Sequence, residues 1–246
     1  MIAWEGAIRA LVTRPQHDAK PLVEALVHRG ISAFISPMLH ITVLTDIGIN
    51  LSGVQVILFT SSNGVRAFAA LTSRRDIPVF AVGDRTAAVA EENGFPQVES
   101  AGGDVEKLAV LVAQCCNPNG GVLFHPAGSA VAGDLSGRLE RCGFVVRRAV
   151  IYEAHQATDF SSEIRKALLD GKVDLVMFFS PRTAKIFVEL AISQGLGLAC
   201  TKLEALCLSD AVAAAAGPII WRRVMVAPNP TQDSLLATLD NRLVEL

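Results

Sequence analysis

The chain has 246 residues, 51% of them hydrophobic and 19% charged, so it can bury a large core and lacks the composition typical of disordered proteins. A net charge of −2 without a long basic run argues against nucleic-acid binding as the main function. Despite a mean hydropathy of +0.40, the chain has no run of about 18 apolar residues and no signal-peptide core at its start, so we expect a cytoplasmic protein without a membrane partner.

Short apolar runs alternate with segments of helical periodicity along the chain. The runs are apolar at nearly every position, which is typical of parallel strands covered by helices on both faces. This alternation predicts an α/β fold with parallel sheets. The predicted strands are 7–13, 54–60, 78–83, 121–126, 173–180, 204–209 and 222–228, and the predicted helices are 20–30, 63–71, 85–94, 104–115, 132–143, 181–191, 210–217 and 231–243.

Several residues have the properties of helix ends. Gly30, Gly94, Gly143 and Gly217 each follow a helical run, where a glycine in the left-handed conformation commonly ends a helix. Thr231 precedes the last run and is predicted to be its N-cap, because a threonine hydroxyl can accept a hydrogen bond from an amide of the first turn.

The order of elements restarts near the middle of the chain, which indicates an internal repeat. LVTRPQHDAK resembles VLFHPAGSAV, with Pro15 corresponding to Pro126. FTSSNGV resembles FSPRTAK, with Ser61 corresponding to Ser180. We therefore expect two similar α/β domains that present equivalent loops.

Two segments, 38–44 and 147–154, differ from the core strands. Each is β-prone and more polar, and each follows a helix and a short apolar turn. As equivalents in the repeat, they are expected to pair as a two-stranded connector. Domain one would then consist of 1–37 and 155–246, and domain two of 45–146. The sequence leaves a simple tandem arrangement of two domains open as the alternative.

Small polar residues follow several predicted strands, directly before a helix. Ligands of α/β sheets bind beyond the carboxyl ends of the strands, and helix N-termini there can hold carboxylates or phosphates. The same residue types are also ordinary N-caps, which is the commoner explanation of any single turn. No glycine-rich phosphate loop and no GxSxG motif occurs. The candidates for anion binding at these turns are Ser61, Ser62, Asn63, Thr86, Ser180 and Ser209.

The cysteines and histidines do not predict a metal or disulfide framework. The five cysteines include no CxxC pair, and the five histidines are scattered without the spacing of metal ligands. His125 is interpreted as a structural polar residue rather than a catalytic base.

A set of motifs in order resembles the uroporphyrinogen-III synthase family: LVTRP, ILFTSSNGVRAF, FAVGDRTA, AGGDVEKL, IYEA, FFSPRTAK, CLSDAVA and APNPTQDSLLATL. The resemblance covers nearly the whole chain. It implies two α/β domains with an interdomain cleft, joined by a two-stranded β connector, with domain one built from both chain ends. It also implies an enzyme that cyclises the linear tetrapyrrole hydroxymethylbilane in that cleft to uroporphyrinogen III, with loss of water and inversion of the terminal ring. Neither a metal nor an organic cofactor is implied.

The resemblance also implies roles for particular residues. Tyr152, the one tyrosine of the chain, matches the family tyrosine that assists loss of the hydroxyl, although a pKa of about 10 makes tyrosine a weak acid. Thr86 and Ser180 match cleft residues that contact the substrate. By residue type alone, Arg14 and Arg182 could pair with substrate carboxylates or could be solvated surface arginines, and Gly128 could allow a close approach or simply form a turn.

One departure from the family pattern is Asp210, which follows Ser209 where an anionic substrate would disfavour a carboxylate. We expect Asp210 to cap the following helix instead, as Asp84 would in the repeat. Asp210 is also the one hint of the alternative function, a non-catalytic tetrapyrrole- or anion-binding regulatory protein on the same fold. A monomer is expected, because such an enzyme needs no partner chain.

Overall fold

The computed structural model describes residues 8–130 and 133–244. The chain forms two compact units, unit 1 from the residues up to His40 and from His155 onward, and unit 2 from Ile41 to Ala154. Both divisions fall within strands, namely β3 (Leu39–Val43) and β8 (Val146–Gln156). Two backbone bonds, from Leu44 to Ile151 and from Ala157 to Met38, show that the two strands run antiparallel.

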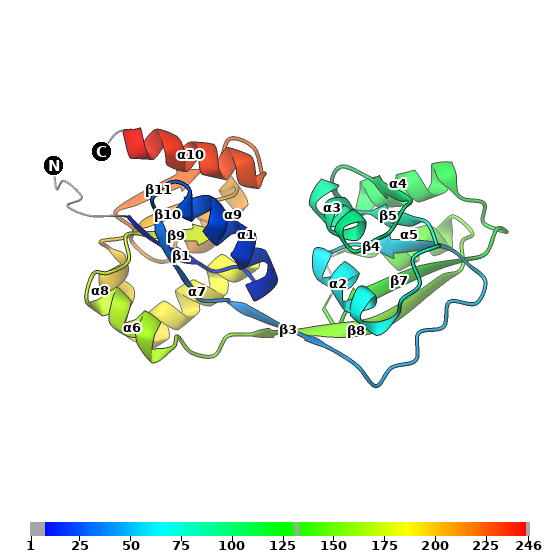
Figure 1. The fold of residues 1–246 in the computed structure, drawn as a ribbon, viewed down its shortest axis with the longest axis horizontal. Coiled ribbons are helices and arrows are strands. Elements are labelled where there is room, and N and C mark those ends of the chain that lie inside the picture. Colours follow the sequence, from blue (N-terminus) through cyan, green and yellow to red (C-terminus); the bar gives the residue numbers. More distant parts are fainter. Residues whose placement is uncertain (1–7, 131–132, 245–246) are drawn as a thin grey trace. The chain divides into compact units, whose positions relative to one another are not determined.

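Unit 1 contains a five-stranded sheet in the order β11-β10-β9-β1-β2, and its neighbouring strands are parallel (Figure 1). Its interior positions are apolar because helices cover both faces, as the continuous apolar runs predicted. The strands are β11 (Arg223–Val226), β10 (Glu204–Cys207), β9 (Leu175–Phe178), β1 (Arg9–Val12) and β2 (Ser32–Ile35).

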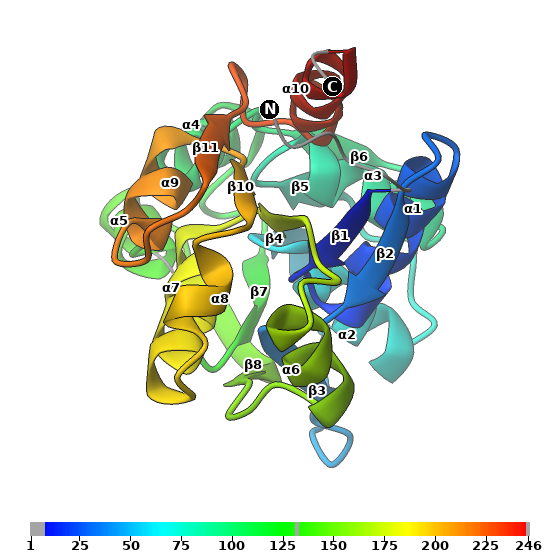
Figure 2. The same ribbon diagram turned by 90° about the vertical axis from the view of Figure 1, so that its left-hand side faces the viewer.

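The two faces of the unit 1 sheet have separate apolar cores. Figure 2 shows α1 and α10 on one side of the sheet and α7, α8 and α9 on the other. The helices are α1 (Gln16–Val27), α6 (Ser162–Leu169), α7 (Pro181–Ser193), α8 (Gly197–Cys200), α9 (Asp210–Ala216) and α10 (Gln232–Val244).

Unit 2 contains a six-stranded sheet in the order β3-β8-β7-β4-β5-β6. The neighbours from β8 to β6 are parallel. Helices α2 and α3 pack on one face of the sheet, and α4 and α5 pack on the other. The remaining bounds are β4 (Val54–Phe59), β5 (Val79–Ala81), β6 (Val98–Ser100), β7 (Val122–Gly128), α2 (Ser62–Leu71), α3 (Asp84–Glu92), α4 (Val105–Cys115) and α5 (Leu135–Arg141).

The predicted α/β class with parallel sheets is confirmed, and the internal repeat is visible in the topology. The order β11-β10-β9-β1-β2 of unit 1 corresponds strand by strand to β6-β5-β4-β7-β8 of unit 2. In this correspondence β2 matches the first part of β8. Strand β3, which has no counterpart in the sheet of unit 1, lies beside the second part of β8.

Two predictions about local structure were wrong. Residues 32–35, expected as a turn, form strand β2, because β1 offers their backbone a parallel partner from Arg9 to Val12. Gly217 does not end α9 in the left-handed conformation, since its φ is −60° and its N–H continues a right-handed turn by bonding to the carbonyl of Ala214. Gly30, Gly94 and Gly143 do have positive φ after their helices.

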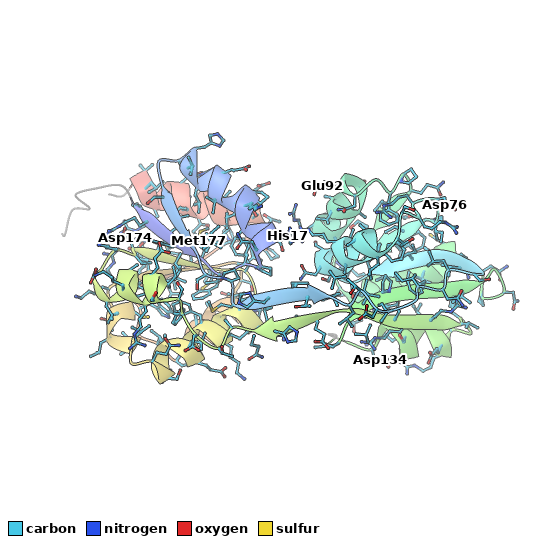
Figure 3. All side chains as sticks on the ribbon, turned by 60° about the horizontal axis from the view of Figure 1, so that its bottom comes forward. His17, Asp76, Glu92, Asp134, Asp174 and Met177 are labelled. Carbon is cyan, nitrogen blue, oxygen red and sulfur yellow. The ribbon has the colours of Figure 1, made fainter. Side chains whose placement is uncertain are left out.

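Buried ion pairs fix the amino ends of the unit 1 strands. Asp174, labelled in Figure 3, accepts hydrogen bonds from the backbone and guanidinium of Arg9 at 2.9 and 3.0 Å. Glu204 accepts from Arg242 at 2.8 Å and pairs with Arg222 at 3.1 Å. These charged groups lie at the amino ends of the strands, whereas the polar turns lie at the carboxyl ends. Among the described residues, no helix has the length and apolar character needed to cross a membrane.

Candidate functional site

The turn after the central strand of each unit has a serine N-cap, although the two serines bind amides at different positions of the first turn. Ser61 and Ser180 are the N-caps of α2 and α7, with extended backbones at φ −163° and −151°. Ser61 Oγ accepts from the N–H of Asn63 at 3.0 Å, and Ser180 Oγ accepts from the N–H of Thr183 at 3.2 Å. Each hydroxyl satisfies one first-turn amide, which is the alternative role that the sequence left open. The predicted contact of both serines with an anionic substrate stays a prediction.

The next turn along each sheet lacks a side-chain cap. Gly83 and Ser209 are the N-caps of α3 and α9, and neither makes a side-chain cap bond. The prediction that Asp84 and Asp210 are N-caps was wrong, because each is the first residue inside its helix. Asp84 instead accepts a hydrogen bond from the hydroxyl of Ser100 at 2.6 Å. The carboxylate is thus held by the neighbouring loop rather than by its own helix.

Thr86 lies in the first turn of α3 and is buried. Its N–H donates to the carbonyl of Gly83 at 2.9 Å. This bond closes the first turn of α3 onto its N-cap residue.

Tyr152 lies on β8 of unit 2, and its side chain contacts residues at the carboxyl ends of β7 and β4. Its side chain is almost entirely buried, and its hydroxyl donates to Ser61 Oγ at 3.3 Å. In the β7–β8 register Tyr152 pairs with Gly128. A Cβ atom on Gly128 would lie 2.8 Å from Tyr152 Cζ, and one on Gly64 would lie 3.8 Å from Cε1. The ring therefore lies against two glycines, and its hydroxyl reaches the cap of α2.

His125, on β7, is buried beside this tyrosine-bearing strand. Its Nε2 lies 3.2 Å from the hydroxyl oxygen of Thr60, the residue before the cap Ser61. Its Nδ1 is buried without a hydrogen-bond partner among the described residues. Burial, aided by the positive charge of Arg148, lowers the pKa of His125 to about 4. The ring is therefore neutral near pH 7, which fits the structural role that the sequence indicated.

In unit 1, Arg14 is held by the protein itself. Its guanidinium lies 4.4 Å from the centre of the Phe179 ring, donates to Gln232 Oε1 at 2.8 Å and lies 3.8 Å from Asp18. Its side chain is 15% exposed, so the protein encloses most of it. Its predicted contact with a substrate carboxylate stays a prediction.

Arg182 is the second residue of α7 and is exposed. It borders a groove of about 700 Å³ on unit 1, together with Lys185, Ile186 and Gln156. Glu189 borders the same groove and lies 3.8 Å from Lys185. The groove thus combines an apolar wall with cations near the N-terminus of α7.

The structure brings only part of the predicted set into contact. Within unit 2, Tyr152 contacts both Ser61 and Gly128, and Ser62 and Asn63 begin the helix that Ser61 caps. Gly64 was not predicted, although its position after three small polar residues was a signal of close packing. Among residues 8–130 and 133–244, no three histidine, cysteine or acidic side chains form a group that could hold a metal ion.

Comparison with known proteins gives one consistent family. A model of the family described as Uroporphyrinogen-III synthase HemD matches residues 20–237. The uroporphyrinogen-III synthase of Chlorobaculum parvum is 27% identical over 202 residues, covering 76% of this chain and 80% of that protein. A putative uroporphyrinogen-III synthase of Methanothermobacter thermautotrophicus is 29% identical over 231 residues, covering 87% of each chain.

Solved structures show the same fold. The uroporphyrinogen-III synthetase of Helicobacter pylori matches with a TM-score of 0.64 at 16% identity, covering 96% of this chain and 99% of that one. A mutant uroporphyrinogen III synthase of Thermus thermophilus matches with a TM-score of 0.57 at 18% identity, covering 98% of this chain and 100% of that one.

Proposed function

The chain belongs to the uroporphyrinogen-III synthase family, and we propose that it is a lyase that cyclises hydroxymethylbilane to uroporphyrinogen III. The reaction breaks the bond between the terminal methylene carbon and its hydroxyl, inverts the last pyrrole ring and closes the macrocycle. The observation that carries the assignment to particular residues is the contact between Tyr152 and Ser61 at the carboxyl ends of the unit 2 strands.

Loss of the hydroxyl needs a proton, since water leaves far more readily than hydroxide. The lone pair of the pyrrole nitrogen can expel the hydroxyl once a donor hydrogen-bonds to its oxygen. We assign that donor to Tyr152, whose O–H is donated to Ser61 Oγ in this structure and would turn to the substrate hydroxyl. The hydroxyl leaves as water, and the proton that it takes up is balanced by the proton that the pyrrole carbon loses when it closes the macrocycle. Because tyrosine is a weak acid, its role is to polarise the departing hydroxyl, with a contribution below the 10²–10⁴-fold typical of full general acid catalysis.

The polar turns offer groups that can bind the carboxylates of the substrate. No side chain caps α3, so the N–H of Asp84, the first residue of the helix, can donate to a carboxylate, whereas the N–H of Thr86 already donates to the carbonyl of Gly83. In unit 1, Arg182 and Lys185 offer positive charge beside the N-terminus of α7. Binding by amides and local cations explains how a chain of net charge −2 can hold a polyanion.

The test is the isomer of the product. The purified protein is supplied with hydroxymethylbilane generated in the same vessel, the products are oxidised, and the uroporphyrin isomers are separated by chromatography. Dominant isomer III above the rate without protein is expected. Isomer I at the rate without protein, from a sample shown to be folded by circular dichroism, would overturn the proposal. The alternative of a non-catalytic binding protein is not favoured, since the family matched here is one of synthases.

We also propose that a single copy of the chain is active. The contacts that place Tyr152 come from residues of unit 2 alone. Light scattering during gel filtration should give a mass near 26.1 kDa under assay conditions.

A further inference from the structure

The backbone pairing between β4 and β7 stops before either strand ends. The paired residues of these two strands end at Ile57 and Phe124. Beyond that point β4 continues to Phe59 and pairs with β5, whereas β7 continues to Gly128 and pairs with β8. Past the last backbone pair, the side chains of Thr60 and His125 make the hydrogen bond that joins the two ends, at 3.2 Å.

The two strand ends beyond this pairing carry the two halves of the environment of Tyr152. The end of β4 leads to Ser61, which accepts the hydrogen bond of the tyrosine hydroxyl. The end of β7 is Gly128, against which the ring lies. A change in the separation of these ends would therefore move the hydroxyl partner relative to the ring support. The link between Thr60 and His125 lies one residue before Ser61 and three before Gly128.

The same two positions are in contact in unit 1. In the internal repeat, the residue before Pro15 is Arg14 and the residue before Pro126 is His125. Likewise Phe179 precedes Ser180, as Thr60 precedes Ser61. Arg14 lies over Phe179, so both units join these strand ends through side chains, although the residue types differ. The two equivalent positions are in contact in both units, although one contact is a hydrogen bond and the other a cation–π contact. This indicates that a side-chain contact at these positions is needed to hold the turn.

We propose that His125 is a positioning residue: its bond to Thr60 fixes the distance between Ser61 and Gly128 and thereby holds the hydroxyl of Tyr152 in place. The expected effect of His125 on turnover rests on the proposed function. Its expected effect on the structure around Tyr152 does not. The residue acts through Thr60 and needs no contact with the substrate. Its neutral state suits this task, because a buried imidazolium would bring a second positive charge next to Arg148.

Tyr152 offers a direct readout because the chain has one tyrosine. Protein labelled with 3-fluorotyrosine should give one fluorine resonance in nuclear magnetic resonance spectra, and that resonance reports the surroundings of this ring. Thr60→Val and His125→Leu remove the link, and His125→Gln keeps a polar group near the position of Nε2. We expect the first two variants to shift or broaden the resonance and His125→Gln to restore it toward that of the unchanged protein.

Turnover is the second readout. Thr60→Val and His125→Leu should lower kcat by about tenfold or more with little change in KM, because a misplaced group costs transition-state stabilisation. In a Tyr152→Phe background the same substitutions should lower kcat much less. Equal losses in both backgrounds would overturn the positioning role, since they would show an effect that does not pass through the tyrosine hydroxyl.

A matched control joins the same two strands at their other ends. Gln55 on β4 donates to the carbonyl of Gly121, directly before β7, at 2.6 Å. Gln55→Leu should leave the fluorine resonance and kcat unchanged. A resonance that moves equally in Gln55→Leu, or that stays unchanged in both Thr60→Val and His125→Leu, would overturn the proposal. If the unchanged protein makes no isomer III but the resonance responds as expected, the positioning stands and the proposed function fails.

Discussion

The hydroxyl of Tyr152 donates to the same Ser61 oxygen that caps helix α2 through the N–H of Asn63. The proposed proton donor and the start of a helix therefore share one acceptor. The equivalent serine of unit 1, Ser180, caps α7 through the N–H of Thr183, and unit 1 has no tyrosine of its own because Tyr152 is the only tyrosine of the chain. The duplicated fold thus supplies two similar caps, of which one carries the additional chemistry.

Removal of the tyrosine hydroxyl tests its assisting role. Tyr152→Phe should lower kcat by about tenfold to a hundredfold, since the departing hydroxyl loses its donor while the other binding groups remain. The free energy of unfolding should fall by only about 1 kcal/mol, because one partly buried hydrogen bond is lost. Initial rates of isomer III formation and urea denaturation measure the two effects. Full activity in Tyr152→Phe would remove this residue from the mechanism.

The two capping serines allow a matched comparison. Ser61→Ala and Ser180→Ala should each destabilise the protein by about 1 kcal/mol through loss of an N-cap. Only Ser61→Ala should also lower kcat, because it removes the partner of Tyr152, whereas loss of the predicted substrate contact of Ser180 would raise KM. The losses of Ser61→Ala and Tyr152→Phe should not add in the double variant. Indistinguishable kcat values for the two serine variants would contradict the role given to the Tyr152–Ser61 contact.

A side chain at Gly128 should displace the tyrosine. The Cβ of an alanine there would lie 2.8 Å from Tyr152 Cζ and 3.1 Å from its hydroxyl oxygen, so the rigid ring has to move. Gly128→Ala is expected to lower kcat about tenfold or more and to destabilise unit 2 by about 1–3 kcal/mol through overpacking. Gly48→Ala is the control, because a Cβ at Gly48 meets nothing within 4 Å. Wild-type turnover in Gly128→Ala would show that the ring position is not critical.

Much of the fold could be predicted from the sequence because it depends on local patterns. Continuous apolar runs before helical segments indicated parallel sheets, and the cap at Thr231 follows from residue type, with Ser234 N–H donating to its hydroxyl at 3.2 Å. Strand β2 was missed because residues 32–35 are short and lie at a sheet edge, where the pattern is weak and pairing with β1 decides.

The candidate site was less accessible to sequence reasoning. Residue types identified Ser61, Gly128 and Tyr152 separately, but their contact depends on the register of β7 with β8. The contacts of Arg14 also come from distant segments, Phe179 and Gln232, so the sequence could not distinguish a ligand contact from an internal one. Asp210 is the first residue of α9, and the N-cap is Ser209, the residue before it. Sequence patterns do not locate a helix end to within one residue, so they could not distinguish these two positions.

Burial of His125 should make stability depend on pH. Its pKa is lowered from 6.5 in an ordinary environment to about 4, so the unfolded chain binds the proton more readily than the folded chain. The folded state is therefore unaffected above about pH 6.5 and loses up to about 3 kcal/mol as the pH falls to about 4. Urea denaturation of the unchanged protein and of His125→Gln across this range measures the effect. The slope with pH should be smaller in His125→Gln, and identical slopes would contradict the neutral state of the buried ring.

Arg14 and Arg182 should differ in what their loss affects. Arg14→Ala removes the contact with Phe179, the bond to Gln232 and the positive charge near the buried Asp18, so we expect unfolding to become easier by about 2 kcal/mol. Arg182→Ala, on the exposed first turn of α7, should change stability by no more than about 0.5 kcal/mol and should instead raise KM, because a cation beside the groove is lost. Thermal denaturation and steady-state kinetics of both variants measure the difference. A raised KM with unchanged stability in Arg14→Ala would show that its guanidinium binds substrate in preference to the internal partners seen here.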